Sequence, residues 1–89
     1  MTSNTISEIL NEYTQQPFYI KDGYIAINDD RVYRIVMFQL TTNDKNEIIV
    51  NFKEILNGVT NAIIRTDKQK IRSLKDFKNK WYSFYNDLH

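Results

Sequence analysis

The strongest hydrophobic pattern lies between Ser73 and Leu88, near the C-terminal end of the chain. At about 100° of rotation per residue, the apolar side chains of this stretch share one side of a helix. They are Leu74, Phe77, Trp81, Phe84, Tyr85 and Leu88. Ser73 followed by Asp76 forms a capping box, whose side-chain oxygens accept hydrogen bonds from free N–H groups of the first turn. The pattern predicts an amphipathic helix that packs its aromatic stripe, including Trp81, on the rest of the fold.

A shorter helical pattern occupies the N-terminal end. Its apolar face is made of Ile6, Ile9, Leu10 and Tyr13. Thr5 and Glu8 form a second capping box, and Pro17 ends the helix. A helix this short is marginal by itself and requires packing against other elements.

Between the two helices the apolar residues alternate as in β-strands. Asp22-Gly23 separates two short strands, 18–21 and 24–28, and it suits a hairpin turn in which both central residues have positive φ. A turn at 28–30 leads into the longest strand, 31–41, whose two faces are both largely apolar. We therefore expect either one helix on each face of the sheet or a second subunit over one face.

After a polar loop at 41–46, a fourth strand begins at 47–50. Residues 51–66 fit three structures. One long helix aligns their apolar residues, although its middle is poor in helix-forming residues. A hairpin is favoured by the turn dipeptide Asn57-Gly58, but it places the charge of Glu54 on the apolar face.

The preferred interpretation of this region is a short helix from Asn51 to Gly58, followed by a strand from Thr60 to Arg65. Residues 67–72 then form a basic connection to the last helix. The whole chain, residues 1–89, is predicted to be one small α+β domain. It has a short N-terminal helix, an antiparallel meander of four to five strands, and a C-terminal amphipathic helix packed on the sheet.

Composition argues against most kinds of catalysis. The chain has no cysteine and its only histidine is the last residue, His89, so thiol chemistry and the usual zinc sites are excluded. The glycines, 23 and 58, are isolated and cannot form a phosphate-binding loop. No apolar run approaches the roughly 20 residues that span a bilayer. We expect a cytoplasmic protein that is not an enzyme, needs no cofactor and does not enter the membrane.

Carboxylates are the remaining candidates for a metal site. Those in neighbouring loops are Asp29, Asp30, Asp44 and Glu47, which could offer oxygen ligands to a divalent cation. Their spacing matches no calcium-binding loop, and an Asp-Asp pair is common in turns for reasons of turn geometry alone. We therefore expect no metal site.

Charge is unevenly distributed although the net charge is only +1. Residues 1–59 hold five Lys/Arg against eight Asp/Glu, whereas residues 60–89 hold seven against three. The candidate binding residues of the basic segment are Arg65, Lys68, Lys70, Arg72, Lys75, Lys78 and Tyr82. Lysines beside an exposed ring can pair with phosphates while a base stacks, or can contact an acidic protein surface. The alternative is a solvated face whose lysine stems shield the aromatic stripe.

The chain resembles, as a class, the small accessory proteins of phages and other mobile elements, which include anti-CRISPR inhibitors of host defence. The resemblance lies in its size, its lack of catalytic groups and its content of Ile, Asn and Lys, which make up 30 of 89 residues. It implies a non-enzymatic protein that binds a protein partner stoichiometrically. The alternative is a single-stranded nucleic-acid-binding or transcription-regulating module. A strand meander followed by an aromatic helix resembles the single-strand-binding transcriptional coactivators, which implies a homodimer.

Overall fold

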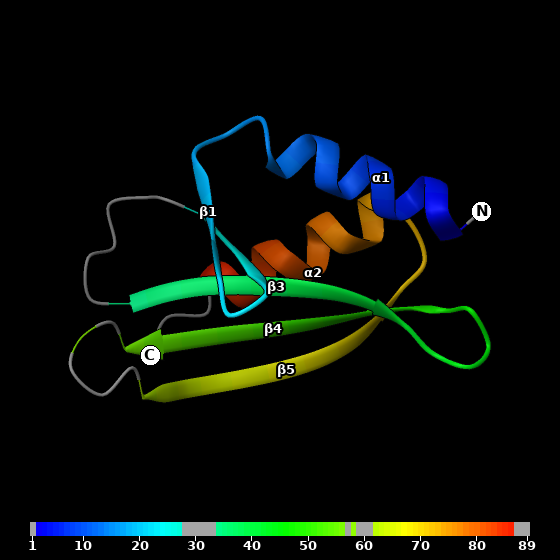
Figure 1. Cartoon of the computed structure of the whole chain (residues 1–89). Coiled ribbons are helices and arrows are strands. Elements are labelled where there is room, and N and C mark those ends of the chain that lie inside the picture. The colour runs from blue at the N-terminus through cyan, green and yellow to red at the C-terminus, as the bar shows by residue number, and fades with distance from the viewer. Residues whose placement is uncertain (1, 28–33, 57, 59–61, 87–89) are drawn as a thin grey trace.

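The described part of the computed structural model covers residues 2–27, 34–56, 58 and 62–86. Its elements are α1 (Thr2–Tyr13), β1 (Phe18–Lys21), β2 (Tyr24–Ile27), β3 (Arg34–Thr42), β4 (Ile48–Leu56), β5 (Ile63–Ile71) and α2 (Leu74–Asn86). The strands form one sheet in the order β1-β2-β3-β4-β5 with antiparallel neighbours (Figure 1). The predicted α+β meander between two helices is therefore confirmed.

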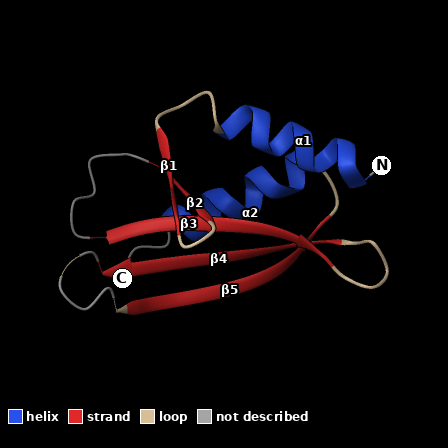
Figure 2. Cartoon of the chain, in the orientation of Figure 1, coloured by secondary structure: helices blue, strands red, loops and turns tan. Residues whose placement is uncertain are grey.

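Both helices lie on the same face of the sheet (Figure 2). Ile9 and Tyr13 of α1 share one buried cluster with residues of α2 and of β3, β4 and β5. The remaining members of this cluster are Val36, Phe38, Ile48, Val50, Phe52, Ile71, Phe77, Trp81 and Phe84. The expectation of one helix on each face is wrong, because the short helix α1 packs beside α2 and completes the same core. Neither of these two helices is long and apolar enough to cross a membrane.

Aromatic rings form the centre of this core. The ring centroids of Phe38 and Phe77 are 4.9 Å apart in an edge-to-face pair, and those of Phe52 and Phe84 are 5.1 Å apart in a stacked pair. Trp81 is only 8% exposed, which confirms its predicted place in the core. Burial, with a smaller effect of Glu12, raises the pKa of Tyr13 to about 12. The Tyr13 phenol is therefore neutral near neutral pH.

At the start of α2, Ser73 caps the helix as predicted, whereas Asp76 accepts a hydrogen bond from a residue that precedes the cap. The Asp76 N–H donates to Ser73 Oγ at 3.1 Å, and the Arg72 N–H donates to Asp76 Oδ2 at 2.9 Å. Desolvation raises the pKa of Asp76, but the hydrogen bonds from Arg72 and from Lys80 outweigh it and lower that pKa.

The capping box predicted at Thr5 for the N-terminal helix is wrong, since α1 already begins at Thr2. Every residue from 2 to 5 is Thr, Ser or Asn, so propensity alone cannot choose the cap.

The β1–β2 hairpin has the predicted turn. Asp22 and Gly23 have φ of 53° and 82°, and Lys21 pairs with Tyr24. Only Ile25 and Ala26 pair with β3, and the hairpin crosses that strand at a steep angle (Figure 1). On the face opposite the helices, Tyr24 packs against a second buried cluster made of Ala26, Ile35, Met37 and Ile55. The hairpin therefore helps to cover the second apolar face of β3.

Residues 48–56 form one uninterrupted strand, so the preferred helix from Asn51 to Gly58 is wrong. In its place β4 and β5 form a hairpin, but the Leu56 N–H donates to the Ala62 carbonyl at 2.8 Å. Five residues of the sequence separate this pair, so the two-residue turn predicted at Asn57-Gly58 is wrong. The basic connection predicted at 67–72 is also wrong, because β5 continues to Ile71. Pairing with β4 along its whole length makes this charged segment a strand. The predicted turn at 28–30 lies outside the described residues.

Candidate binding surface on the sheet

The seven residues singled out in the basic segment lie on separate surfaces. Arg65 points toward the helices, whereas Lys68 and Lys70 point to the opposite face of β5, as the alternation of a strand requires. The other four follow in or just before α2: Arg72, Lys75, Lys78 and Tyr82. The structure therefore does not bring the segment together as one patch.

On α2, Lys78 and Tyr82 are engaged differently. The Lys78 ammonium forms an ion pair with Glu12 of α1 at 3.0 Å. Tyr82 is 71% exposed beside the buried Trp81. Lys78 therefore helps to join the two helices, while Tyr82 lies on the outer surface of α2.

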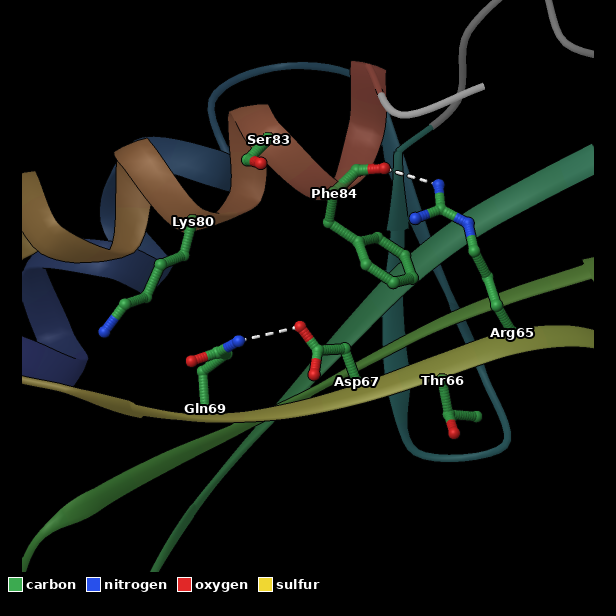
Figure 3. Close-up of a pocket in the computed structure, with 7 residues that line it drawn as sticks. All are labelled: Arg65, Thr66, Asp67, Gln69, Lys80, Ser83 and Phe84. Carbon is green, nitrogen blue, oxygen red and sulfur yellow. Dashed lines mark hydrogen bonds between the residues drawn. The ribbon is translucent and has the colours of Figure 1, made fainter. Parts of the chain in front are cut away.

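Arg65 holds β4, β5 and α2 together around a buried charge. Glu54 is fully buried, and its Oε1 accepts a hydrogen bond from Arg65 Nε at 2.6 Å. Arg65 Nη2 donates to the Phe84 carbonyl, and the guanidinium lies 3.8 Å from the centroid of the Phe84 ring (Figure 3). Arg34 Nη1 approaches Glu54 Oε2 at 3.8 Å. These contacts assign Arg65 a structural role.

A groove of about 300 Å³ runs between β5 and α2 (Figure 3). Its polar side chains largely satisfy one another: Gln69 Nε2 donates to Asp67 Oδ2 at 2.8 Å, and Lys80 Nζ donates to the Lys70 carbonyl at 2.7 Å. Lys80 also pairs with Asp76 at 3.2 Å. Because opposite charges already compensate within and beside the groove, it is a weak candidate for binding a charged ligand.

The opposite face of the sheet is different. Side chains such as Val50 and Phe52 point to the helices, so the residues alternating with them point away. The strand register aligns Gln39, Asn51 and Lys68 across β3, β4 and β5, with Lys53 and Thr66 in the next row. Tyr24 lies on the same side of β2, next to the Ile25–Phe38 pair. We call this surface the lysine face and define it as Tyr24, Gln39, Asn51, Lys53, Thr66, Lys68 and Lys70.

A hollow of about 540 Å³ opens on the lysine face. Tyr24, Asn51, Thr66 and Lys68 line it, together with parts of Phe52 and Asp67. The Lys53 ammonium lies 4.1 Å from the centroid of the Tyr24 ring. The hollow therefore combines an aromatic ring, an amide, a hydroxyl and a cation.

Charge on the lysine face is positive. Among the described strand residues that point to this side, none is Asp or Glu, and the Lys68 ammonium forms no ion pair within the described part of the chain. Glu47 lies just before β4 and binds Lys70 at 2.6 Å. Hydrogen bonds from Lys70 and then from Asn43 lower the pKa of Glu47, so this carboxylate stays charged and neutralises Lys70. Lys53 and Lys68 are the two cations of the lysine face that no described carboxylate binds.

Sequence reasoning selected Lys68 and Lys70 but missed Tyr24, Asn51 and Lys53. Period-2 alternation within β4 is the signal that finds Asn51 and Lys53, since these two residues alternate with the apolar Val50 and Phe52. The helix predicted for residues 51–58 hid this signal.

A metal site finds no support in the described ranges, where no three His, Cys, Asp or Glu side chains gather to hold an ion. Asp29 and Asp30 lie outside those ranges, and Glu47 is engaged by Lys70 and Asn43.

Comparison of the chain with protein-family models, curated proteins and solved structures finds no match. A proposal about function therefore has to start from the surfaces of the protein.

Proposed function

We propose that the chain is a non-enzymatic binding protein that holds an acidic surface of a protein partner on its lysine face. One observation carries the proposal: this face has lysines, no carboxylate among its described strand residues, and neither α1 nor α2 over it. Opposite charges across an interface speed the encounter and fix its orientation. Tyr24 adds a ring with a polar tip, a side chain that is frequent in protein interfaces.

The size of the face fits one partner at a time. Strands β3, β4 and β5 each have nine residues, which corresponds to a length of about 30 Å. A standard interface takes about 800 Å² from each partner. Such a contact would occupy most of this face and the adjoining hairpin, so binding is one-to-one and works by covering the partner's surface. This mode of action suits an accessory protein of a mobile element, such as an inhibitor of a host defence system.

Reversing charge on the lysine face is expected to abolish capture of the partner. Tagged wild-type protein should enrich a partner from a bacterial lysate, and Lys53→Glu/Lys68→Glu should recover at least about tenfold less of it, because like charges then face each other. Quantitative mass spectrometry of the eluates measures the ratio.

The matched control is Lys45→Glu/Lys75→Glu, which makes the same charge change at exposed lysines away from the lysine face. It should retain the partner. If wild type enriches nothing, or if the control loses as much as the test variant, the proposal is wrong.

A second candidate function is binding of single-stranded nucleic acid, and the hollow beside Tyr24 favours it. A base can stack on an aromatic ring while lysines pair with the phosphates on either side. Tyr24 has Lys53 over its ring, and Lys68 and Asn51 line the same hollow. For this candidate function we therefore propose a site on the sheet instead of on the basic C-terminal segment.

For this function, fluorescence anisotropy with a labelled oligothymidine strand should show affinity that falls with salt. Contact of Lys53 and Lys68 with phosphates predicts a slope of about −1.4 in a plot of log K against log salt concentration. Tyr24→Ala should weaken binding by about tenfold, and Tyr82→Ala on the outer surface of α2 should not. Salt-independent binding, or none, would exclude this candidate.

A further inference from the structure

The two edges of the sheet are protected very differently. An edge strand exposes unpaired backbone groups that another strand can bind. On β5, the Lys68 N–H donates to Asp67 Oδ1 at 3.0 Å and the Lys70 carbonyl accepts from Lys80 Nζ at 2.7 Å. By the alternation of an antiparallel ladder, these two groups point away from β4. Charged side chains therefore occupy the outer edge of β5.

Among the residues that the structure describes, none protects the outer edge of β1 in this way. The turn at Asp22-Gly23 closes the pair Lys21–Tyr24, so Lys21 and Tyr19 direct their backbone hydrogen bonds to β2. The N–H and C=O groups of Phe18 and Ile20 must then point outward. Lys21 is the only charged residue of this strand.

The side chains of the same two residues are apolar and exposed. Phe18 is 39% and Ile20 is 61% exposed. They pair with Ile27 and Ile25, which are partly buried against the core. The apolar layer under the helices therefore continues to the edge of the sheet and ends there in water.

We propose that a second copy of the chain pairs with this edge, β1 against β1 in antiparallel orientation, around a two-fold axis at Tyr19. Side chains directly opposite each other must lie on the same face of the joined sheet, and a centre at Tyr19 meets that condition. Phe18 of each copy then lies opposite Ile20 of the other copy. In each of these two pairs, the backbone N–H of either residue donates to the backbone C=O of the residue opposite. Aromatic residues opposite β-branched residues stabilise such pairs.

Self-complementarity is the reason to choose a second copy as the occupant. In this register both outward-pointing residues of each β1 find apolar counterparts. Lys21 of one copy lies opposite Pro17 of the other, so the two lysines do not face each other. The joined sheet exposes only its two β5 edges, which Asp67 and Lys80 protect. The lysine face stays open, so this proposal is independent of the proposed function.

Sedimentation velocity of the full chain tests the dimer across about 5–500 µM. Wild type should sediment as twice its 10.7 kDa mass at the higher concentrations. Ile20→Lys should raise the dimer dissociation constant at least about tenfold, because it places charge in the apolar pair. Ile63→Lys is the matched control, since Ile63 is 62% exposed but lies on β5. It should leave the dissociation constant unchanged.

Amide hydrogen exchange of the wild type gives a second measurement that needs no variant. The Phe18 and Ile20 amides should be protected at high concentration and exchange rapidly on dilution, because only the second copy accepts their hydrogen bonds. A wild type that stays monomeric at about 500 µM overturns the proposal. A dimer that Ile20→Lys and Ile63→Lys weaken equally, or one that leaves these two amides unprotected, overturns it as well.

Discussion

Replacing Glu54 with leucine is expected to lower the free energy of unfolding by about 3–5 kcal/mol, although leucine is the more apolar residue. Glu54 is fully buried, and the Arg65 side chain that it binds at 2.6 Å is only 16% exposed. Removing the carboxylate takes away the acceptor of the Arg65 Nε hydrogen bond and a negative charge beside a poorly solvated guanidinium. Urea denaturation followed by the fluorescence of Trp81 measures the loss.

The double variant Glu54→Leu/Arg65→Leu is the informative control. Replacing both members of a buried ion pair by apolar residues is often neutral, so the double variant should be more stable than Glu54→Leu alone. The two single changes should therefore be coupled by more than about 1 kcal/mol, as for residues in direct contact. Strictly additive losses would show that Glu54 and Arg65 do not stabilise each other.

The same pair explains why the sequence was misinterpreted between residues 51 and 66. A carboxylate on the apolar face of a hairpin argued against that hairpin. The structure resolves the conflict by placing Arg65 directly opposite Glu54 in the register of β4 and β5. Which residues lie opposite each other depends on pairing between strands, and the pattern within either strand does not contain that information.

Features set by neighbouring residues were predictable. Ser73 and Asp76 start α2, and Asp22-Gly23 turns the first hairpin, because each signal acts within a few residues. The placement of α1 beside α2 was not predictable, since either face of β3 is apolar enough to receive a helix.

The candidate site shows the same limit. The basic segment looked like one patch because its members are close in sequence, yet Arg65 and Lys68 are an odd number of positions apart in a strand and point to opposite faces. The lysine face gathers Tyr24, Asn51 and Lys68 from three different strands. Only the register brings these residues together.

Replacing Trp81 with alanine is expected to destabilise the fold by about 3–5 kcal/mol. Its ring lies among those of Phe38, Phe52 and Phe77, with centroid distances of 5.3, 5.8 and 6.3 Å. Alanine would leave a cavity at the contact between α2 and the sheet, which the surrounding rings can fill only in part. Urea denaturation followed by far-UV circular dichroism measures the loss, since the variant has no tryptophan.

Tyr82→Ala is the matched control, because it removes the neighbouring aromatic side chain of the same helix. Tyr82 is 71% exposed, whereas Trp81 is 8% exposed. A surface change of this kind should alter the free energy of unfolding by no more than about 0.5 kcal/mol. The contrast between adjacent residues separates core packing from helix propensity, since both variants gain the same helix-favouring alanine. Equal losses in the two variants would mean that α2 does not bury its aromatic stripe against the sheet.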